Sequence, residues 1–158
     1  MIILHGIWAS KEAELEKGHA WADSGYRVAL VDLRGHGRSS GDFLTYGVVE
    51  SDDLVKVITA MEQEGALKRP LCLIGYSYGG AVALQTAARD RRVDAVASVS
   101  TFATMRQVVG RYVVAKLPLI GSLLTEEQVD SATAEAGRLA GFDPARANTV
   151  EAVRRITV

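Results

Sequence analysis

The pentapeptide Gly75-Tyr76-Ser77-Tyr78-Gly79 has the pattern G-x-S-x-G, with a serine at its centre and a glycine two positions to either side. An apolar run, Leu71 to Ile74, precedes it, and a segment rich in glycine and alanine follows it. This context is typical of a nucleophile elbow, in which a strand turns sharply into a helix and presents the serine hydroxyl at the carboxyl edge of a sheet. A chance match in a loop would lack both flanking elements. The pattern therefore predicts Ser77 as the nucleophile of an acyl-transfer reaction.

A second feature, the dipeptide His5-Gly6, closes the short apolar run that begins at Ile2. If this strand lies beside the strand that carries Ser77, the carboxyl ends of both strands meet at one edge of the sheet. The backbone N–H groups of Tyr78 and Ile7 would then face the same substrate carbonyl. Two backbone donors about 3 Å from a developing negative charge form an oxyanion hole. We therefore expect Tyr78 and Ile7 to supply it.

Four short apolar runs and three amphipathic segments alternate over the first hundred residues. The runs predict strands near residues 2–5, 27–32, 71–75 and 94–99, and the segments predict helices over 10–24 and 48–64 and from just after Ser77 to Arg89. Strands that alternate with helices indicate βαβ units and a parallel sheet with helices on both faces. The expected class is α/β, a three-layer αβα sandwich.

The pattern changes after Ser100. Residues 104–117 and 125–140 are expected to be helical, and 155–158 resembles the opening of a further strand. One domain is expected overall, with a core over 1–100, a helical cap or lid with connecting helices over 101–154, and the start of a truncated strand over 155–158. The apolar segment Tyr112 to Leu124 is either a lid over an acyl site or a helix and connector that pack on the sheet.

Three motifs together resemble the α/β-hydrolase superfamily: His5-Gly6 after the first strand, the stretch from Gly25 to Ser39 (GYRVALVDLRGHGRS), and the elbow at Ser77. The resemblance implies a sheet order of second, first, third and fourth strand. It is strongest for the serine esterase, thioesterase and aminopeptidase-like branches that have a cap after the fourth of these strands. It covers residues 1–100 well, so the chain is expected to be a partial α/β-hydrolase fold.

The order of catalytic residues in this superfamily is nucleophile, acid, histidine, but no histidine follows His36 in the chain. The resemblance places the acid and the histidine beyond Val158. His5 is the one upstream histidine whose strand adjoins the elbow, and the resemblance makes it structural rather than catalytic. His36 is expected to fix its loop by a hydrogen bond, and His19 to be a solvated or packing residue on a helix.

Charge and composition exclude several function classes. The 158 residues include 18 Lys and Arg against 19 Asp and Glu, a formal net charge of −1, so no basic excess favours nucleic acid. One cysteine, Cys72, and three scattered histidines cannot build a metal cluster, and acyl transfer by serine requires no cofactor. The apolar stretches are too short or too interrupted for a signal peptide or a membrane span. A cytoplasmic location is expected.

These observations predict a serine hydrolase that cleaves an ester, a thioester or a small amide of a small-molecule acyl substrate through a Ser77 acyl-enzyme. Two alternatives remain, a non-catalytic binding module of the same fold and an inactive fragment of a longer hydrolase. Trp8 beside Ile7 lines the acyl pocket or packs in the core, and Cys72 is expected to be buried and inert. The sequence does not indicate the substrate or the oligomeric state.

Overall fold

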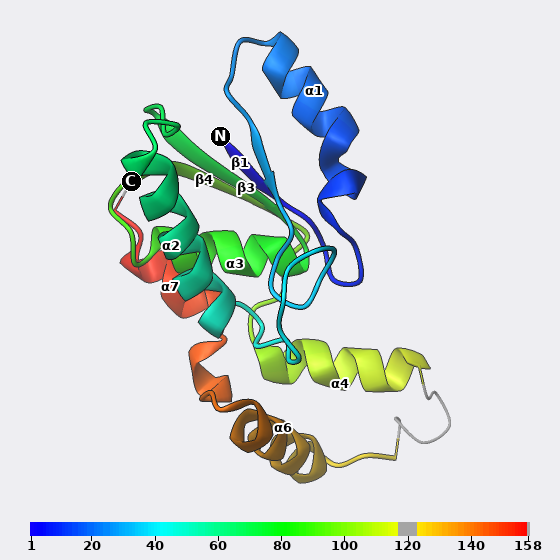
Figure 1. Cartoon of the computed structure of the whole chain (residues 1–158). Helices are drawn as coiled ribbons and strands as arrows, with labels where there is room; N and C mark the ends of the chain where they lie inside the picture. The colour runs from blue at the N-terminus through cyan, green and yellow to red at the C-terminus, as the bar shows by residue number, and fades with distance from the viewer. Residues whose placement is uncertain (117–122, 158) are drawn as a thin grey trace.

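Four parallel strands form the centre of the molecule in the computed structural model, which describes residues 1–116 and 123–157 (Figure 1). The strands are β1 (Ile2–Leu4), β2 (Ala29–Val31), β3 (Leu71–Tyr76) and β4 (Val93–Val99). Their order is β2-β1-β3-β4, and every neighbouring pair is parallel. The strands, their direction and their order are those expected from the sequence.

Helices lie on both faces of the sheet (Figure 1). On one face a 3-10 turn, Lys11–Glu14, leads into α1 (Leu15–Asp23), so the helix expected from residue 10 begins as a tighter turn. The opposite face carries α2 (Val48–Gln63), α3 (Tyr78–Ala87) and α7 (Thr149–Arg155). The fold is therefore a three-layer sandwich with a parallel sheet, as expected.

The hydrophobic core lies between the sheet and the α2–α3 layer. It includes alternate residues of the strands, among them Ile2, Leu4 and Leu73, together with Leu54 and Ile58 of α2. All three residues of β1 are buried, because this central strand is covered on both faces. Burial of apolar area at about 25 cal/mol per Å² is the main stabilising contribution here.

The layer on the other face is narrower. Helix α1 and its preceding turn contact β1 and β2, whereas Ala95, Ala97 and Val99 of β4 are exposed on that side. Cys72 of β3 points to the same face and is only partly buried. The expectation that Cys72 is buried was therefore wrong, because a strand buried on one face alternates between covered and open positions.

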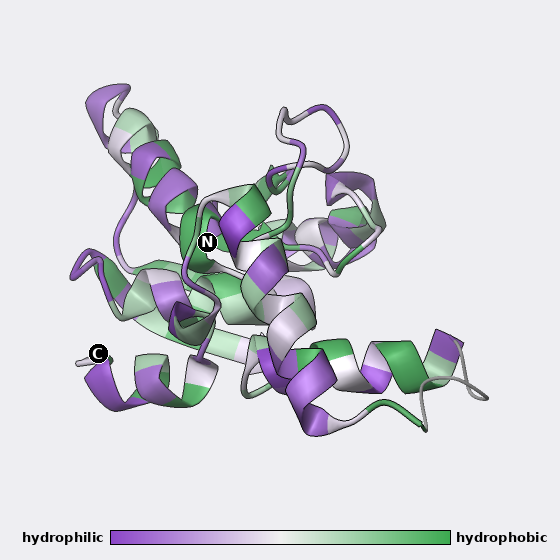
Figure 2. Cartoon of the chain, turned by 90° about the horizontal axis from the view of Figure 1, so that it is seen from below, coloured by the Kyte–Doolittle hydropathy of each residue, from purple (hydrophilic) through white to green (hydrophobic). Residues whose placement is uncertain are grey.

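Two further helices, α4 (Met105–Lys116) and α6 (Glu126–Ala140), project beyond the carboxyl edge of the strands (Figure 1). They pack against each other, and Arg106 of α4 forms ion pairs with Glu126, at 2.9 Å, and with Asp130. Apolar and hydrophilic residues alternate along α4 (Figure 2). Of the segment considered above as a lid, Tyr112 to Lys116 complete α4, and residues 117–122 lie outside the described residues. The lid interpretation stays a prediction.

The start of a strand was expected at 155–158. For Arg155 this prediction is wrong, because Arg155 is the last residue of α7. The Asn148 side chain caps this helix by accepting a hydrogen bond from the Glu151 N–H, and the buried Ala152 anchors it. The cap and the buried residue stabilise α7, whose last turn includes Arg155. Ile156 is extended, and Val158 lies outside the described residues. A 3-10 turn, Pro144–Arg146, precedes α7.

Candidate active site

Ser77 lies between β3 and α3 with φ 50° and ψ −109°, so the positive φ expected for a nucleophile elbow is confirmed. A residue with a side chain adopts this backbone conformation only where the surrounding structure holds it. The neighbouring glycines allow this tight turn. A Cβ atom on Gly75 would overlap the backbone of Gly79, and a Cβ atom on Gly79 would lie 2.5 Å from the carbonyl oxygens of Leu4 and His5.

The turn is also held from the side of β4. The Ser77 N–H donates a hydrogen bond to the Val99 carbonyl, at 2.8 Å, and the Thr101 hydroxyl donates one to the Ser77 carbonyl, at 2.9 Å. Ser100, between these two partners, also has a positive φ of 56°. Thr101 was not predicted from the sequence as part of the site. Its position could have been inferred, because Thr101 follows β4 and the carboxyl ends of adjacent parallel strands meet at one edge of the sheet.

The His5-Gly6 turn lies directly against the elbow. A Cβ atom built on Gly6 would lie 3.8 Å from the Ser77 Cβ and 3.7 Å from the Tyr76 carbonyl oxygen. The Ile7 N–H forms no hydrogen bond within the described part of the chain, and the Tyr78 N–H is one of the first N–H groups of α3, which lack partners inside the helix. Both groups remain candidates for an oxyanion hole.

Trp8 does not pack in the core, because its side chain is 80% exposed. Its backbone has a positive φ of 63°, and its N–H donates to the His36 Nε2 at 3.3 Å. The core alternative for Trp8 is therefore wrong, and its contact with an acyl group stays a prediction.

Both ring nitrogens of His5 and of His36 are occupied by backbone groups. The His5 Nε2 accepts a hydrogen bond from the Leu33 N–H at 3.1 Å, so its Nδ1 carries the proton and donates to the Gly6 carbonyl at 2.7 Å. In the same way the His36 Nε2 accepts from Trp8 and its Nδ1 donates to the Arg34 carbonyl at 2.9 Å. His36 therefore fixes its loop, as expected.

This arrangement excludes His5 as a base for Ser77. Complete burial lowers the pKa of His5, and its one basic nitrogen is already used by Leu33. His19 is exposed on α1, in the layer that covers β1 and β2. Among residues 1–116 and 123–157, no histidine nitrogen forms a hydrogen bond with the Ser77 hydroxyl.

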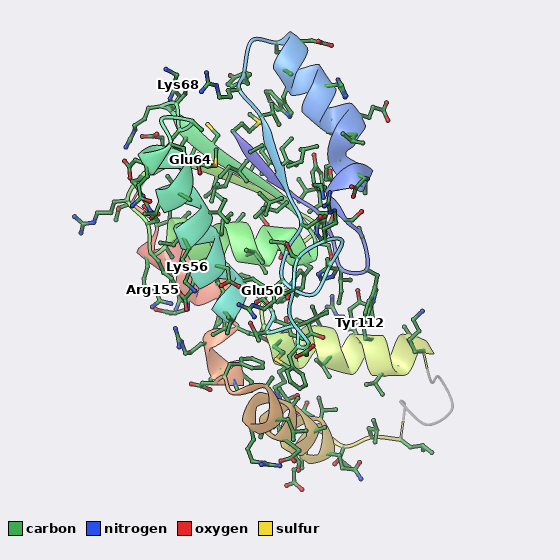
Figure 3. All side chains as sticks on the ribbon, viewed as in Figure 1. Glu50, Lys56, Glu64, Lys68, Tyr112 and Arg155 are labelled. Atoms are coloured by element: carbon green, nitrogen blue, oxygen red, sulfur yellow. The ribbon has the colours of Figure 1, made fainter. Side chains whose placement is uncertain are left out.

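The loop after β2 is organised around the buried carboxylate of Asp32. The carboxylate accepts hydrogen bonds from the Lys11 N–H at 2.8 Å, from the Lys11 Nζ and from the Arg38 N–H at 3.1 Å. Burial alone would raise the pKa of Asp32, but these donors outweigh it and lower the pKa to about 2. A second buried carboxylate, that of Glu50, lies at the start of α2 (Figure 3) and accepts hydrogen bonds from the Thr45 and Gly47 N–H groups.

Substitution of Asp32 by asparagine is expected to lower the free energy of unfolding by about 2 kcal/mol, because Lys11 loses its charged partner at a buried site. The low pKa of Asp32 means that its contribution is complete above its ordinary value of 3.8 and is lost as the pH falls toward about 2. Urea denaturation between pH 7 and pH 2 measures both effects. The control Asp52→Asn, which removes an exposed ion pair with Arg89, should cost less than about 0.5 kcal/mol. Equal losses in the two variants would contradict the structural role of Asp32.

A cavity of about 350 Å³ opens beside Ser77. Its other walls come from the β4–α4 connection and from one face of α4, and the lining residues are Ser77, Ser100, Thr101, Phe102, Ala103, Gln107, Val108 and Arg111. The β4–α4 connection is itself held by the first residue of α7, since Thr149 donates hydrogen bonds to the carbonyls of Phe102 and Ala103. The cavity wall is therefore built from parts of the chain far apart in the sequence.

Two further observations concern the described residues alone. Within residues 1–116 and 123–157, no group of three or more His, Cys, Asp or Glu side chains is arranged to hold a metal ion. Over the same ranges, no helix is both long enough and apolar enough to cross a membrane.

Comparisons with known proteins agree with this fold. Residues 1–146 match the profile of the alpha/beta hydrolase fold family, so the chain belongs to that family. The esterase Pf2001 of Pyrococcus furiosus superposes with a TM-score of 0.70 and 25% identity, covering 99% of this chain and 57% of that one. A second crystal form of the same esterase gives a TM-score of 0.63 and 27% identity over 77% of this chain and 51% of that one.

Curated relatives match shorter parts of the chain. The uncharacterized protein YqkD of Bacillus subtilis is 33% identical over 84 residues, which are 53% of this chain and 28% of that protein. A pimeloyl-[acyl-carrier protein] methyl ester esterase of Cronobacter sakazakii is 32% identical over 108 residues, which are 64% of this chain and 36% of that enzyme. The matched region thus spans about a third of the length of these relatives.

Proposed function

We propose that the protein is a serine hydrolase that cleaves an ester of a small-molecule acyl group through an acyl-enzyme on Ser77. The observation that carries this proposal is the strained Ser77 backbone at a strand-to-helix turn that opens onto a cavity. An ester is preferred to a thioester or a small amide because two similar proteins, the Pyrococcus enzyme and the Cronobacter enzyme, are named esterases.

In the proposed reaction the Ser77 oxygen attacks the ester carbonyl, and the leaving alcohol departs as the acyl-enzyme forms. The N–H groups of Tyr78 and Ile7 stabilise the negative charge on the carbonyl oxygen, and the amino end of α3 adds a favourable dipole. Thr101 and Val99 support this step by holding the Ser77 backbone. Water then releases the acid.

The general base is expected to come from outside residues 1–158. The three histidines of the chain are bound by backbone groups or lie away from the elbow, and no histidine follows His36. The base, its orienting acid and a cytoplasmic location all stay predictions.

A non-catalytic binding module of the same fold is the second candidate, and the occupied nitrogens of His5 and His36 favour it. Such a module would bind the same ligands whether or not Ser77 is present, and it would form no covalent adduct.

Covalent labelling distinguishes the two candidates. A fluorophosphonate is expected to form one adduct on Ser77 at alkaline pH, with loss of fluoride, and mass spectrometry of the tryptic peptides locates it. Ser77→Ala should abolish the adduct. Ser100→Ala, which changes a second hydroxyl in the same cavity, should leave it. An unlabelled Ser77 after prolonged incubation would reject the proposal in favour of the binding module.

A further inference from the structure

The wall of the Ser77 cavity that α4 supplies carries a positive charge. Gln107 and Arg111 both line the cavity and are four residues apart, so they lie on the same face of the helix. Three other lining residues, Ser77, Ser100 and Thr101, are polar and uncharged. None of the described residues that line the cavity is acidic, so Arg111 gives this lining its one charge, which is positive.

Arg111 differs from the other arginine near the start of the same helix. Arg106 forms ion pairs with Glu126 and Asp130 of α6 and does not line the Ser77 cavity. In the ranges that the structure describes, no carboxylate lies within ion-pair distance of Arg111. The charge of Arg106 is thus neutralised within the fold, whereas Arg111 is exposed and lines the cavity.

The size of the cavity limits the size of the ligand that can contact Arg111. Its volume of about 350 Å³ is at the low end of ligand pockets, which suits a short acyl chain. A planar guanidinium binds carboxylate and phosphate oxygens through paired N–H groups, and the Gln107 amide adds a further donor one turn away.

We propose that Arg111 makes the Ser77 cavity selective for short acyl esters that carry an anionic group, a carboxylate or a phosphonate, at the end remote from the ester. This inference rests on the proposed function, since it names the substrate class of the same cavity. The N–H groups beside Ser77 hold the ester carbonyl, while Arg111 and Gln107 hold the anionic end.

Isothermal titration calorimetry tests the inference without turnover. Monomethyl glutarate carries the charge, dimethyl glutarate does not, and methyl 4-phosphonobutyrate places a phosphonate at the same position. At low salt the wild-type protein is expected to bind monomethyl glutarate about tenfold more tightly than the dimethyl ester, and the ratio should shrink as salt screens the charge. The phosphonate arm shows which anion Arg111 prefers.

Arg111→Gln is expected to bring the ratio close to one, and Arg111→Lys to keep part of it because the charge remains. The matched control on the same helix, Arg106→Gln, should keep the wild-type ratio. Circular dichroism confirms that each variant is folded. Equal affinities for the two glutarate esters in the wild-type protein, an unchanged ratio in Arg111→Gln, or no measurable binding of either ester would overturn the inference.

The two proposals fail in different ways. Ser77→Ala should keep the charge preference, because Arg111 is unaltered. A preserved preference together with an unlabelled Ser77 would reject the serine nucleophile alone. A labelled Ser77 with no charge preference would reject the role of Arg111 alone.

Discussion

Substitution of Gly79 by alanine is expected to lower the free energy of unfolding by at least about 3 kcal/mol, because the new methyl group has no room. Its Cβ would lie 2.5 Å from the carbonyl oxygens of Leu4 and His5 and 2.7 Å from the Leu4 carbonyl carbon. These are backbone atoms at the carboxyl end of the central strand. They cannot move away without disturbing the pairing of β1 with β3.

Urea denaturation measures this loss, and the control is the same chemical change elsewhere. Gly110 lies within α4, and a Cβ atom there would meet no atom of the described residues within 4 Å. Gly110→Ala is therefore expected to stabilise the protein by about 0.5 to 1 kcal/mol, since alanine favours the helix. Similar denaturation midpoints for the two variants would contradict the close contact between α3 and β1 at Gly79.

The second large effect that we expect is a slow reaction of Ser77. A positioned general base contributes about 10²–10⁴-fold to such reactions, so Ser77 is expected to react slowly with a fluorophosphonate in these 158 residues. Its labelling rate should rise steadily with pH and show no plateau near the ordinary pKa of histidine, about 6.5. Added imidazole should accelerate the labelling in proportion to its concentration, because it supplies the base from solution.

The adduct on Ser77 is followed by mass spectrometry with the probe in large excess, so hydrolysis of the probe by imidazole is not counted as labelling and does not exhaust the probe. His19→Gln changes an exposed histidine on α1 and should leave both the rate and its imidazole dependence unaltered. A labelling rate that reaches a plateau between pH 6 and 8 without imidazole, at about the pKa of a histidine, would show that an internal base exists.

Local patterns in the sequence were sufficient for the fold and for the position of the elbow. Ser77 could be identified because its glycines, its preceding apolar run and its following small residues are contiguous. The strand order could be identified from the resemblance of three motifs to a known superfamily. Arg155 was misplaced in a strand because the helix that contains it begins at Thr149, after the Asn148 cap, and that cap was not recognised in the sequence.

Contacts between distant segments could not be derived in this way. Thr101 fixes the Ser77 carbonyl from 24 residues away, and Arg111 reaches the same cavity through the placement of α4. The role of His5 also depended on such contacts, because the Leu33 N–H that occupies its Nε2 comes from the loop after the neighbouring strand.

The sequence by itself determined the α/β class, the parallel sheet and the candidate nucleophile, because periodicity, small residues and turn chemistry are local properties of the chain. Only the tertiary structure decided which groups surround Ser77: the bonds to Val99 and Thr101, the occupied histidine nitrogens and the cationic wall of the cavity. The physical reason is that hydrogen bonds and close contacts depend on ångström-scale positions, which are set by the packing of elements far apart in the chain.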